Sequence, residues 1–269
     1  MKETRLMMGM PITVEIIDND ATTVDLQKVF DYFNYVEEKF SLFKKTSEIT
    51  KINAGEINPK EYSDDMKKIF TASEETKKLT NGYFNIEKHD GTYDTSGIVK
   101  GWAIYNAAEL LKKAGFKNYY VEAGGDIQVH GNNDKGEPWS IGIRDPFDKT
   151  GLRIIKVVYL ANNEGIATSG TYLRGQHIYN PHDVEQKHIT DIVSLTVIGQ
   201  NIYEADRFAT AAFAMGKNGI SFIENLSGFE GYIIDKNGIA TFTSSFEKYL
   251  EKNTKVNSLL KRFKSYLTQ

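Results

Sequence analysis

The stretch that decides the fold is Asp94-Thr95-Ser96-Gly97-Ile98-Val99-Lys100-Gly101, which places an acid, two hydroxyls, two glycines and a lysine at the start of a helix. Over residues 98–114, large apolar residues recur at helical spacing and alanines fill the positions between them. Lysines in the last turn and the following Gly115 predict the end of this helix. Thr95 and Ser96 are both suitable N-cap residues.

The start of this helix has the chemistry of an anion site. Free backbone N–H groups and the positive end of the helix dipole attract an anion, and Lys100 adds a full positive charge. A phosphate group is the expected ligand. Taken alone, the segment also fits an ordinary capped surface helix with a solvated Lys100, because glycine and lysine are common at helix starts. The rest of the chain has to decide between the two.

Length and composition indicate an ordinary soluble protein, and we predict a single domain over residues 1–269. The chain has 40% hydrophobic and 26% charged residues, which is enough to bury a large core as one domain or as two fused halves. No apolar run approaches the roughly 20 residues that cross a bilayer, so we predict no membrane span. The charged N-terminus does not resemble a secretory signal, and a cytoplasmic location is expected.

Cysteine content and charge exclude several classes of function. Without cysteine the chain has no disulfide, no thiolate metal site and no cysteine nucleophile, so any metal must bind oxygen or imidazole. A formal net charge of −3 and a pI near 6.0 argue against nucleic acid as a partner. Lysine is abundant only at 252–264, where the apolar spacing predicts an amphipathic helix that closes the fold.

Apolar periodicity predicts the other elements. Recurrence every three to four residues predicts helices at 24–40, 64–80 and 205–215, and Ser47 is a suitable cap for a short helical turn through Asn53. Alternating apolar residues predict strands at 6–17, which begins at a kink, and at 119–123, 127–131, 139–143, 153–160, 165–170 and 191–199, with a last hairpin over 231–243. Strands and helices mixed along one chain predict the α+β class.

Two smaller patterns suggest a ligand site. Gly124 and Gly125 interrupt a strand pattern, which suggests a bulge or a ligand close to the backbone. Asp206 and Thr210 lie four residues apart in a predicted helix, so their carboxylate and hydroxyl share one face. The pair also fits an exposed aspartate beside a threonine that bonds back to its own helix.

Taken together, short sequence blocks in a fixed order resemble the ApbE-type FAD:protein FMN transferases. The resemblance runs from Met8 to about Lys248. Its blocks are Met8-Gly9-Met10, an aromatic-rich loop over 40–53, and residues 82–85, 94–101, 124–126, 166–170, 177–181 and 204–210. Each block is short, but so many blocks in one order form a specific signal.

The resemblance implies antiparallel sheets with helices packed on their outer faces and a ligand cleft between two halves of the fold. It also implies a defined reaction. The family transfers the FMN half of FAD to a Ser or Thr hydroxyl of a recipient protein, releases AMP and uses a divalent cation, usually Mg²⁺. FAD as substrate, Mg²⁺ as cofactor and a recipient protein as partner are therefore expected. Two alternatives remain open, namely a Mg²⁺-dependent pyrophosphatase that splits FAD with water and a flavin-binding protein without catalytic activity.

The resemblance also implies roles for individual residues. Mg²⁺ would bind the carbonyl of Gly97 and the side chains of Asp206 and Thr210, and Lys100 would act in catalysis facing the diphosphate. His177 would be the general base, since imidazole titrates near neutral pH, although a structural histidine in a turn fits that position equally well. The implied contacts with FAD, besides Lys100, are Met8, Phe43, Tyr83, Phe84, Asn85, Asp94, Asp126 and Tyr179.

The chain departs from the family pattern at several positions. Asn85 and Asn180 stand where the family has aspartates, and Glu122 stands where asparagine is usual. A larger departure is the segment 86–93, because family members usually carry several dozen residues there. We therefore expect a shortened wall of the cleft, which opens the pocket, alters the surface for the recipient, or leaves a flavin binder that does not transfer.

Overall fold

The computed structural model describes residues 1–171, 178–183 and 188–251. Its helices are α1 Thr23–Phe40, α2 Glu48–Asn53, α3 Asp64–Leu79, α4 Ser96–Lys113, α5 Ile202–Ala214 and α6 Gly219–Glu224. Its strands are β1 Lys2–Met7, β2 Met10–Ile16, β3 Tyr119–Ala123, β4 Asp126–His130, β5 Trp139–Arg144, β6 Ile154–Leu160, β7 Gly165–Gly170, β8 Ile192–Gly199, β9 Glu230–Asp235 and β10 Ala240–Phe242. The helix predicted at 252–264 lies outside the described residues.

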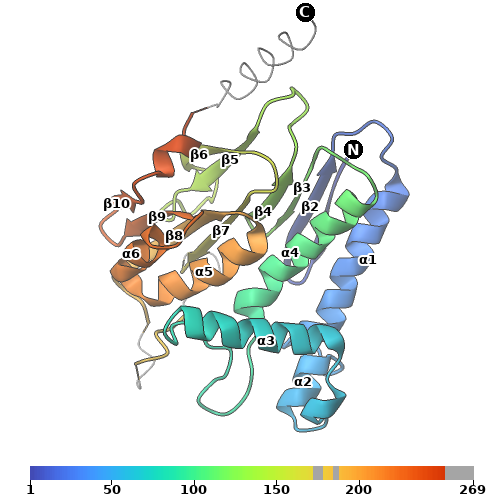
Figure 1. Ribbon diagram of the computed structural model, residues 1–269, viewed down its shortest axis with the longest axis vertical. Helices are drawn as coiled ribbons and strands as arrows, with labels where there is room; N and C mark the ends of the chain where they lie inside the picture. The colour runs from blue at the N-terminus through green and yellow to red at the C-terminus, as the bar shows by residue number, and fades with distance from the viewer. Residues whose placement is uncertain (172–177, 184–187, 252–269) are drawn as a thin grey trace, which may run out of the picture.

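An eight-stranded sheet forms the centre of the fold, with strand order β1-β2-β3-β4-β7-β8-β9-β10. Each neighbouring pair is antiparallel, and β5 and β6 form a separate antiparallel pair. In Figure 1 the helices α1, α4 and α5 cover one face of the large sheet. The predicted α+β class with antiparallel sheets and outer helices is confirmed.

Alternating side chains give the large sheet a core on each face. On the helix side, the strand β2 buries Ile12, Val14 and Ile16 in the same cluster as the apolar face of α1. On the other side, Ile166 of β7 belongs to a second cluster with Trp139 of β5. Because successive residues of a strand point to opposite faces, one sheet serves both cores.

Helix α1 follows its predicted amphipathic pattern. Its buried residues are Leu26, Val29, Phe30, Phe33, Val36 and Phe40. Burying one such side chain contributes about 1.5–3 kcal/mol. Helix α2 begins as predicted, because the Ser47 hydroxyl accepts a hydrogen bond of 3.2 Å from the backbone N–H of Thr50.

Helices α3, α4 and α5 are joined by buried polar contacts. Gly101 of α4 donates its backbone N–H to a carboxylate oxygen of Asp206 on α5 at 2.7 Å. Arg207, the next residue of α5, donates to the Thr76 hydroxyl of α3 at 2.8 Å. Figure 1 shows α3 lying across the ends of α4 and α5. These contacts fix the segment that leads from α3 into the start of α4.

Two glycine-containing turns correct the strand predictions. The single N-terminal strand expected at 6–17 is a hairpin of β1 and β2, with positive φ angles of 51° at Met8 and 72° at Gly9. Gly124 and Gly125 do not bulge a strand but connect β3 to β4. Their φ angles are 60° and 98°, as a two-residue hairpin turn requires.

Candidate active site

A cavity of about 620 Å³ lies where the start of α4, the end of β7 and one face of α5 meet. This volume is within the range typical of small-molecule sites. The segment 83–90, which follows α3, supplies another wall. The cavity therefore lies between the early part of the chain and the part that follows β7, as expected for a cleft between two halves.

The start of α4 faces this cavity with Ser96, Gly97 and Lys100. Thr95 is the N-cap residue but makes no side-chain cap hydrogen bond. The Asp94 carboxylate takes over part of that role, because it accepts the backbone N–H of Ser96 at 3.0 Å. The helix start predicted from the sequence is thus present and borders a hollow large enough for a ligand.

Lys100 lies between two buried carboxylates. Its ammonium nitrogen is 2.6 Å from Oδ2 of Asp126 and 3.4 Å from Oδ1 of Asp206. The Asp126 and Asp206 side chains are only 2% and 3% exposed, whereas Lys100 is 19% exposed. Burial raises the pKa of Asp206 to about 7, while the charge of Lys100 acts in the opposite direction. The lysine compensates two carboxylates that would otherwise be buried without a counter-charge.

The oxygens of Gly97 and Thr210 meet in the same cavity. The Thr210 hydroxyl lies 3.4 Å from the Gly97 carbonyl oxygen, although 113 residues separate them in the chain. A Cβ atom on Gly97 would lie 3.0 Å from Cγ2 of Thr210. The absence of a side chain at position 97 is therefore what lets α4 and α5 bring these two oxygens together.

These oxygens and the Asp206 carboxylate fit a hard divalent cation by their chemistry. Mg²⁺ prefers oxygen ligands and is commonly bound through one or two carboxylates, with water and substrate phosphate completing the shell. Among the described residues no group of three or more His, Cys, Asp or Glu side chains could hold a metal ion. A cation here would therefore rely on one carboxylate, one hydroxyl, one carbonyl and its ligand.

Asp94 forms part of the cavity wall beside a lysine that the sequence did not single out. Its Oδ2 atom lies 3.3 Å from the ammonium of Lys88. Burial alone would raise the pKa of Asp94, but hydrogen bonds from Ser96 and the charge of Lys88 lower it below the ordinary value. The Asp94 carboxylate is thus held in its charged form at the mouth of the α4 site.

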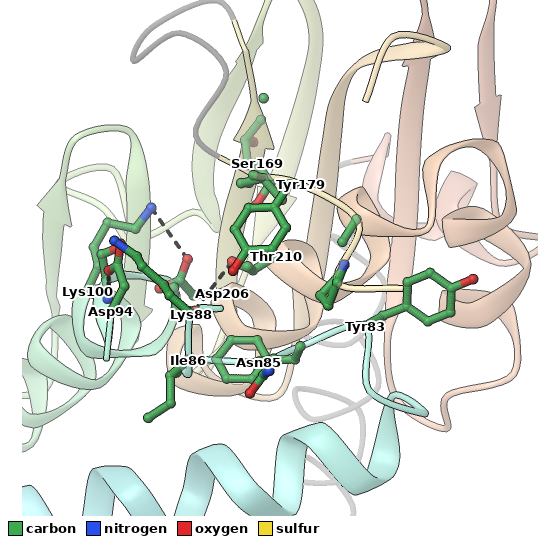
Figure 2. A pocket seen from close by; sticks show the side chains of 18 of the residues that line it. Tyr83, Asn85, Ile86, Lys88, Asp94, Lys100, Ser169, Tyr179, Asp206 and Thr210 are labelled. Carbon is green, nitrogen blue, oxygen red and sulfur yellow. Dashed lines mark hydrogen bonds and ion pairs between the residues drawn. The ribbon is translucent and has the colours of Figure 1, made fainter. Parts of the chain in front are cut away.

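Aromatic and amide side chains from the segment after α3 form another part of the cavity wall. Tyr83, Phe84 and Asn85 all border the cavity, and Tyr83 lies far from Lys100 in Figure 2. Phe84 is only 3% exposed and also belongs to the main core. Its backbone N–H donates to the Thr80 hydroxyl at 3.1 Å, which fixes the chain at this point.

Three predicted site residues in the described part of the chain, Met8, Phe43 and Asp126, do not line the cavity. Phe43 is 97% exposed, and Met8 lies in the turn between β1 and β2. Asp126 lies behind Lys100 and contacts the site through it. His177 lies outside the described residues, although Tyr179 lines the cavity. For these residues the ligand contacts stay predictions.

Sequence reasoning missed the short loop that carries Lys88, His89 and Asp90, all of which line the cavity. The sequence predicts only a shortened wall of the cleft there, without a role for its side chains. Thr168 and Ser169 at the end of β7 also line the cavity and fall in one of the family-like blocks. Turn residues carry no apolar periodicity, so only their charge could have marked them.

The helices of the described residues include none that is long and apolar enough to span a membrane.

The described residues thus form an α+β protein with a ligand-sized cavity at the start of a helix. A sequence model of the ApbE family matches residues 8–90 and 87–233, and the chain belongs to this family. The two matched stretches meet at residues 87–90. The family model is therefore interrupted where the loop carrying Lys88 lies.

Individual relatives agree with this assignment. The FAD:protein FMN transferase of Haemophilus influenzae is 26% identical and covers 93% of this chain and 93% of its own length. That alignment runs over 325 positions, more than this chain contains, so the relative carries insertions absent here. The FAD:protein FMN transferase of Vibrio cholerae is 31% identical over 59% of this chain and 50% of its own length.

A solved structure supports the fold. The flavin transferase ApbE from Vibrio cholerae superposes with a TM-score of 0.80 and 22% identity, over 93% of this chain and 99% of that one. At this identity the likeness shows a shared fold.

Proposed function

We propose that this protein is an enzyme that transfers the FMN half of FAD to a Ser or Thr hydroxyl of a recipient protein and releases AMP. Relatives that bear the name FAD:protein FMN transferase match this chain, one of them over nearly its whole length. The observation that carries the proposal is the convergence of Lys100, Asp206 and Thr210 on one cavity in a member of the ApbE family.

The reaction exchanges one phosphorus–oxygen bond for another. The acceptor hydroxyl oxygen attacks the phosphorus of the FMN half, the bond from that phosphorus to the bridging oxygen breaks, and AMP leaves with the bridging oxygen. Such a transfer depends mainly on positioning and on stabilising negative charge. Lys100 at the start of α4 would stabilise the diphosphate, and its own charge is balanced by Asp126 and Asp206.

Mg²⁺ would be held by the Gly97 carbonyl, the Asp206 carboxylate and the Thr210 hydroxyl, all oxygen donors in one cavity. When bound it would offset the charge of the diphosphate and orient it. The proton of the acceptor hydroxyl needs a base, and His177 is the proposed acceptor.

The test combines purified protein, FAD, Mg²⁺ and an acceptor protein domain with a reactive threonine. Transfer should yield AMP and a covalently fluorescent acceptor band in equal amounts. The matched control is the same acceptor with that threonine changed to valine, which should give no band. A second control with a chelator should abolish both products.

Other product patterns contradict transfer. The interrupted family match at residues 87–90 and the loop's place in the cavity wall favour pyrophosphatase activity as the second candidate, because a shorter wall admits water more easily. AMP and free FMN without a labelled band would establish that activity. Tight FAD binding with neither product would leave a flavin-binding protein.

A further inference from the structure

The loop 87–93 is a compact, internally bonded turn rather than a loose remnant of a longer segment. The Lys88 backbone N–H donates to the carbonyl of Thr92 at 2.8 Å, and Gly91 donates back to the Lys88 carbonyl at 3.0 Å. The Asp90 carboxylate accepts from both the backbone N–H and the hydroxyl of Thr92, at 2.9 and 2.6 Å. These bonds fix the backbone from which the Lys88 side chain projects.

The same loop is tied to the body of the protein. The Asn53 side chain at the end of α2 bonds to both backbone groups of Tyr93, donating to its carbonyl at 2.9 Å and accepting its N–H at 2.8 Å. The Tyr93 ring also packs edge-on against Phe70 of α3, with 4.8 Å between ring centroids. The backbone of the loop that carries Lys88 is therefore held in place beside the cavity.

Lys88 and Lys100 are the two lysines that line the cavity in the described part of the chain, and their surroundings differ. Lys100 is 19% exposed and lies between Asp126 and Asp206. Lys88 is 40% exposed, and it pairs at 3.3 Å with Asp94, whose side chain is 31% exposed. An ion pair between two partly exposed side chains contributes little, so a phosphate can compete for Lys88.

Carboxylates outnumber lysines in the cavity lining, so each lysine there matters for binding an anion. Asp90, Asp94 and Asp206 contribute three carboxylates to the lining, against the two lysines. A diphosphate adds further negative charge, and an anion is bound well only where positive charge offsets it. Figure 2 shows Lys88 and Lys100 at the same end of the cavity, close to Asp94 and Asp206.

We propose that Lys88 is a phosphate-binding residue that holds the diphosphate of FAD together with Lys100. The inference rests on the proposed function, because it takes the ligand to be a flavin dinucleotide. The family match breaks at residues 87–90, within the turn that carries this lysine. In this chain the short turn thus supplies a binding charge at the place where the family sequence is interrupted.

Calorimetry with four ligands tests the assignment on the full chain. FAD and ADP carry the diphosphate, whereas riboflavin and adenosine lack it. Lys88→Ala should weaken FAD and ADP about tenfold or more, while riboflavin and adenosine bind as they do to the unchanged protein. Lys88→Arg should restore most of the loss because it keeps the charge. The matched control is Lys113→Ala, an exposed lysine in the last turn of α4.

The salt dependence of FAD affinity gives a second measurement. It would not change if Lys88 had only a structural role. FAD affinity should fall with ionic strength, and less steeply in Lys88→Ala, because one screened charge contact is gone. Equal FAD affinity and equal salt slope in Lys88→Ala would overturn the inference, as would an equal loss for all four ligands. If the unchanged protein binds neither FAD nor ADP, the proposed function fails instead. Binding without transfer would refute only the transferase activity.

Discussion

The backbone N–H of Gly101 donates a hydrogen bond of 2.7 Å to Oδ2 of Asp206, across 105 residues of sequence. This bond joins α4 to α5 at the proposed active site and fixes one oxygen of the carboxylate. The other oxygen faces Lys100 at 3.4 Å. The orientation of the proposed metal ligand is therefore set by the close approach of two helices.

Gly101→Ala tests that close approach. A Cβ atom at this position would lie 2.6 Å from Cβ of Asp206 and 2.9 Å from the Ile202 carbonyl oxygen, so the helices would have to move apart. We expect a loss of about 1–3 kcal/mol in the free energy of unfolding, measured by urea denaturation, with a large drop in FAD turnover. The control Glu109→Ala, on the outer part of α4, should change stability by about 0.5 kcal/mol or less.

Asp206→Asn tests the cation site while keeping the side-chain shape. The amide oxygen can still accept the Gly101 N–H, so we expect unfolding free energy within about 1 kcal/mol of the unchanged protein. Added Mg²⁺ should raise the melting temperature of the unchanged protein but not of this variant, and Mg²⁺-dependent turnover should disappear. Asp31→Asn, on the exposed side of α1, is the matched control. If Mg²⁺ raised the melting temperature of Asp206→Asn as much as that of the unchanged protein, the cation would bind elsewhere.

His177→Ala tests the proposed general base. Loss of a positioned base lowers turnover by about a hundredfold or more, while FAD affinity should stay unchanged because the residue acts on the acceptor. Rapid-quench measurement of AMP release checks this. His130→Gln, at the end of β4, should keep full turnover. An undiminished rate in His177→Ala would assign proton transfer to another group.

Glu48→Gln tests how the free energy of unfolding depends on pH in the acid range, at a position away from the proposed active site. Its carboxylate accepts from the backbone and hydroxyl of Ser63, both at 2.7 Å, and from Lys39 at 3.0 Å. Burial raises the pKa of Glu48, but these bonds outweigh burial and lower it below 4.5. A pKa lowered by folding stabilises the protein above about pH 4.5, and this stability is lost as pH falls further.

The variant should therefore lose about 1–2 kcal/mol at pH 7 and show a flatter decline in stability below about pH 4.5. Urea unfolding from pH 3 to 7 measures both effects. Glu38→Gln is the control, since its side chain is 60% exposed in its ion pair with Lys44. A decline as steep in Glu48→Gln as in the unchanged protein would contradict the assignment.

Elements whose periodicity is strong were predicted correctly because each can be recognised from its own residues. Helix α1 shows its apolar face every three to four residues, and helix α3 was predicted as residues 64–80 against an observed Asp64–Leu79. The turns were harder. The hairpin at Met8-Gly9 and the Gly124-Gly125 turn depend on positive φ angles, which composition indicates only weakly.

The candidate site was likewise predicted only in part from the sequence. The ligand types at Gly97, Asp206 and Thr210 were chosen from sequence blocks, but their convergence on one cavity follows from the packing of α4 against α5. The placement of Phe43 and Met8 away from the cavity could not be predicted, since both belong to turns whose direction depends on the elements around them.

The sequence by itself determined the α+β class, the helix that starts at Ser96 and the resemblance to the ApbE family, because these depend on local periodicity and on short runs of neighbouring residues. Only the tertiary structure decided that Lys100 lies between Asp126 and Asp206, and that Lys88 stands beside Asp94 in the same cavity. The physical reason is that side chains distant in sequence meet only when the sheet and helices pack. Spacing along the chain carries no record of that packing.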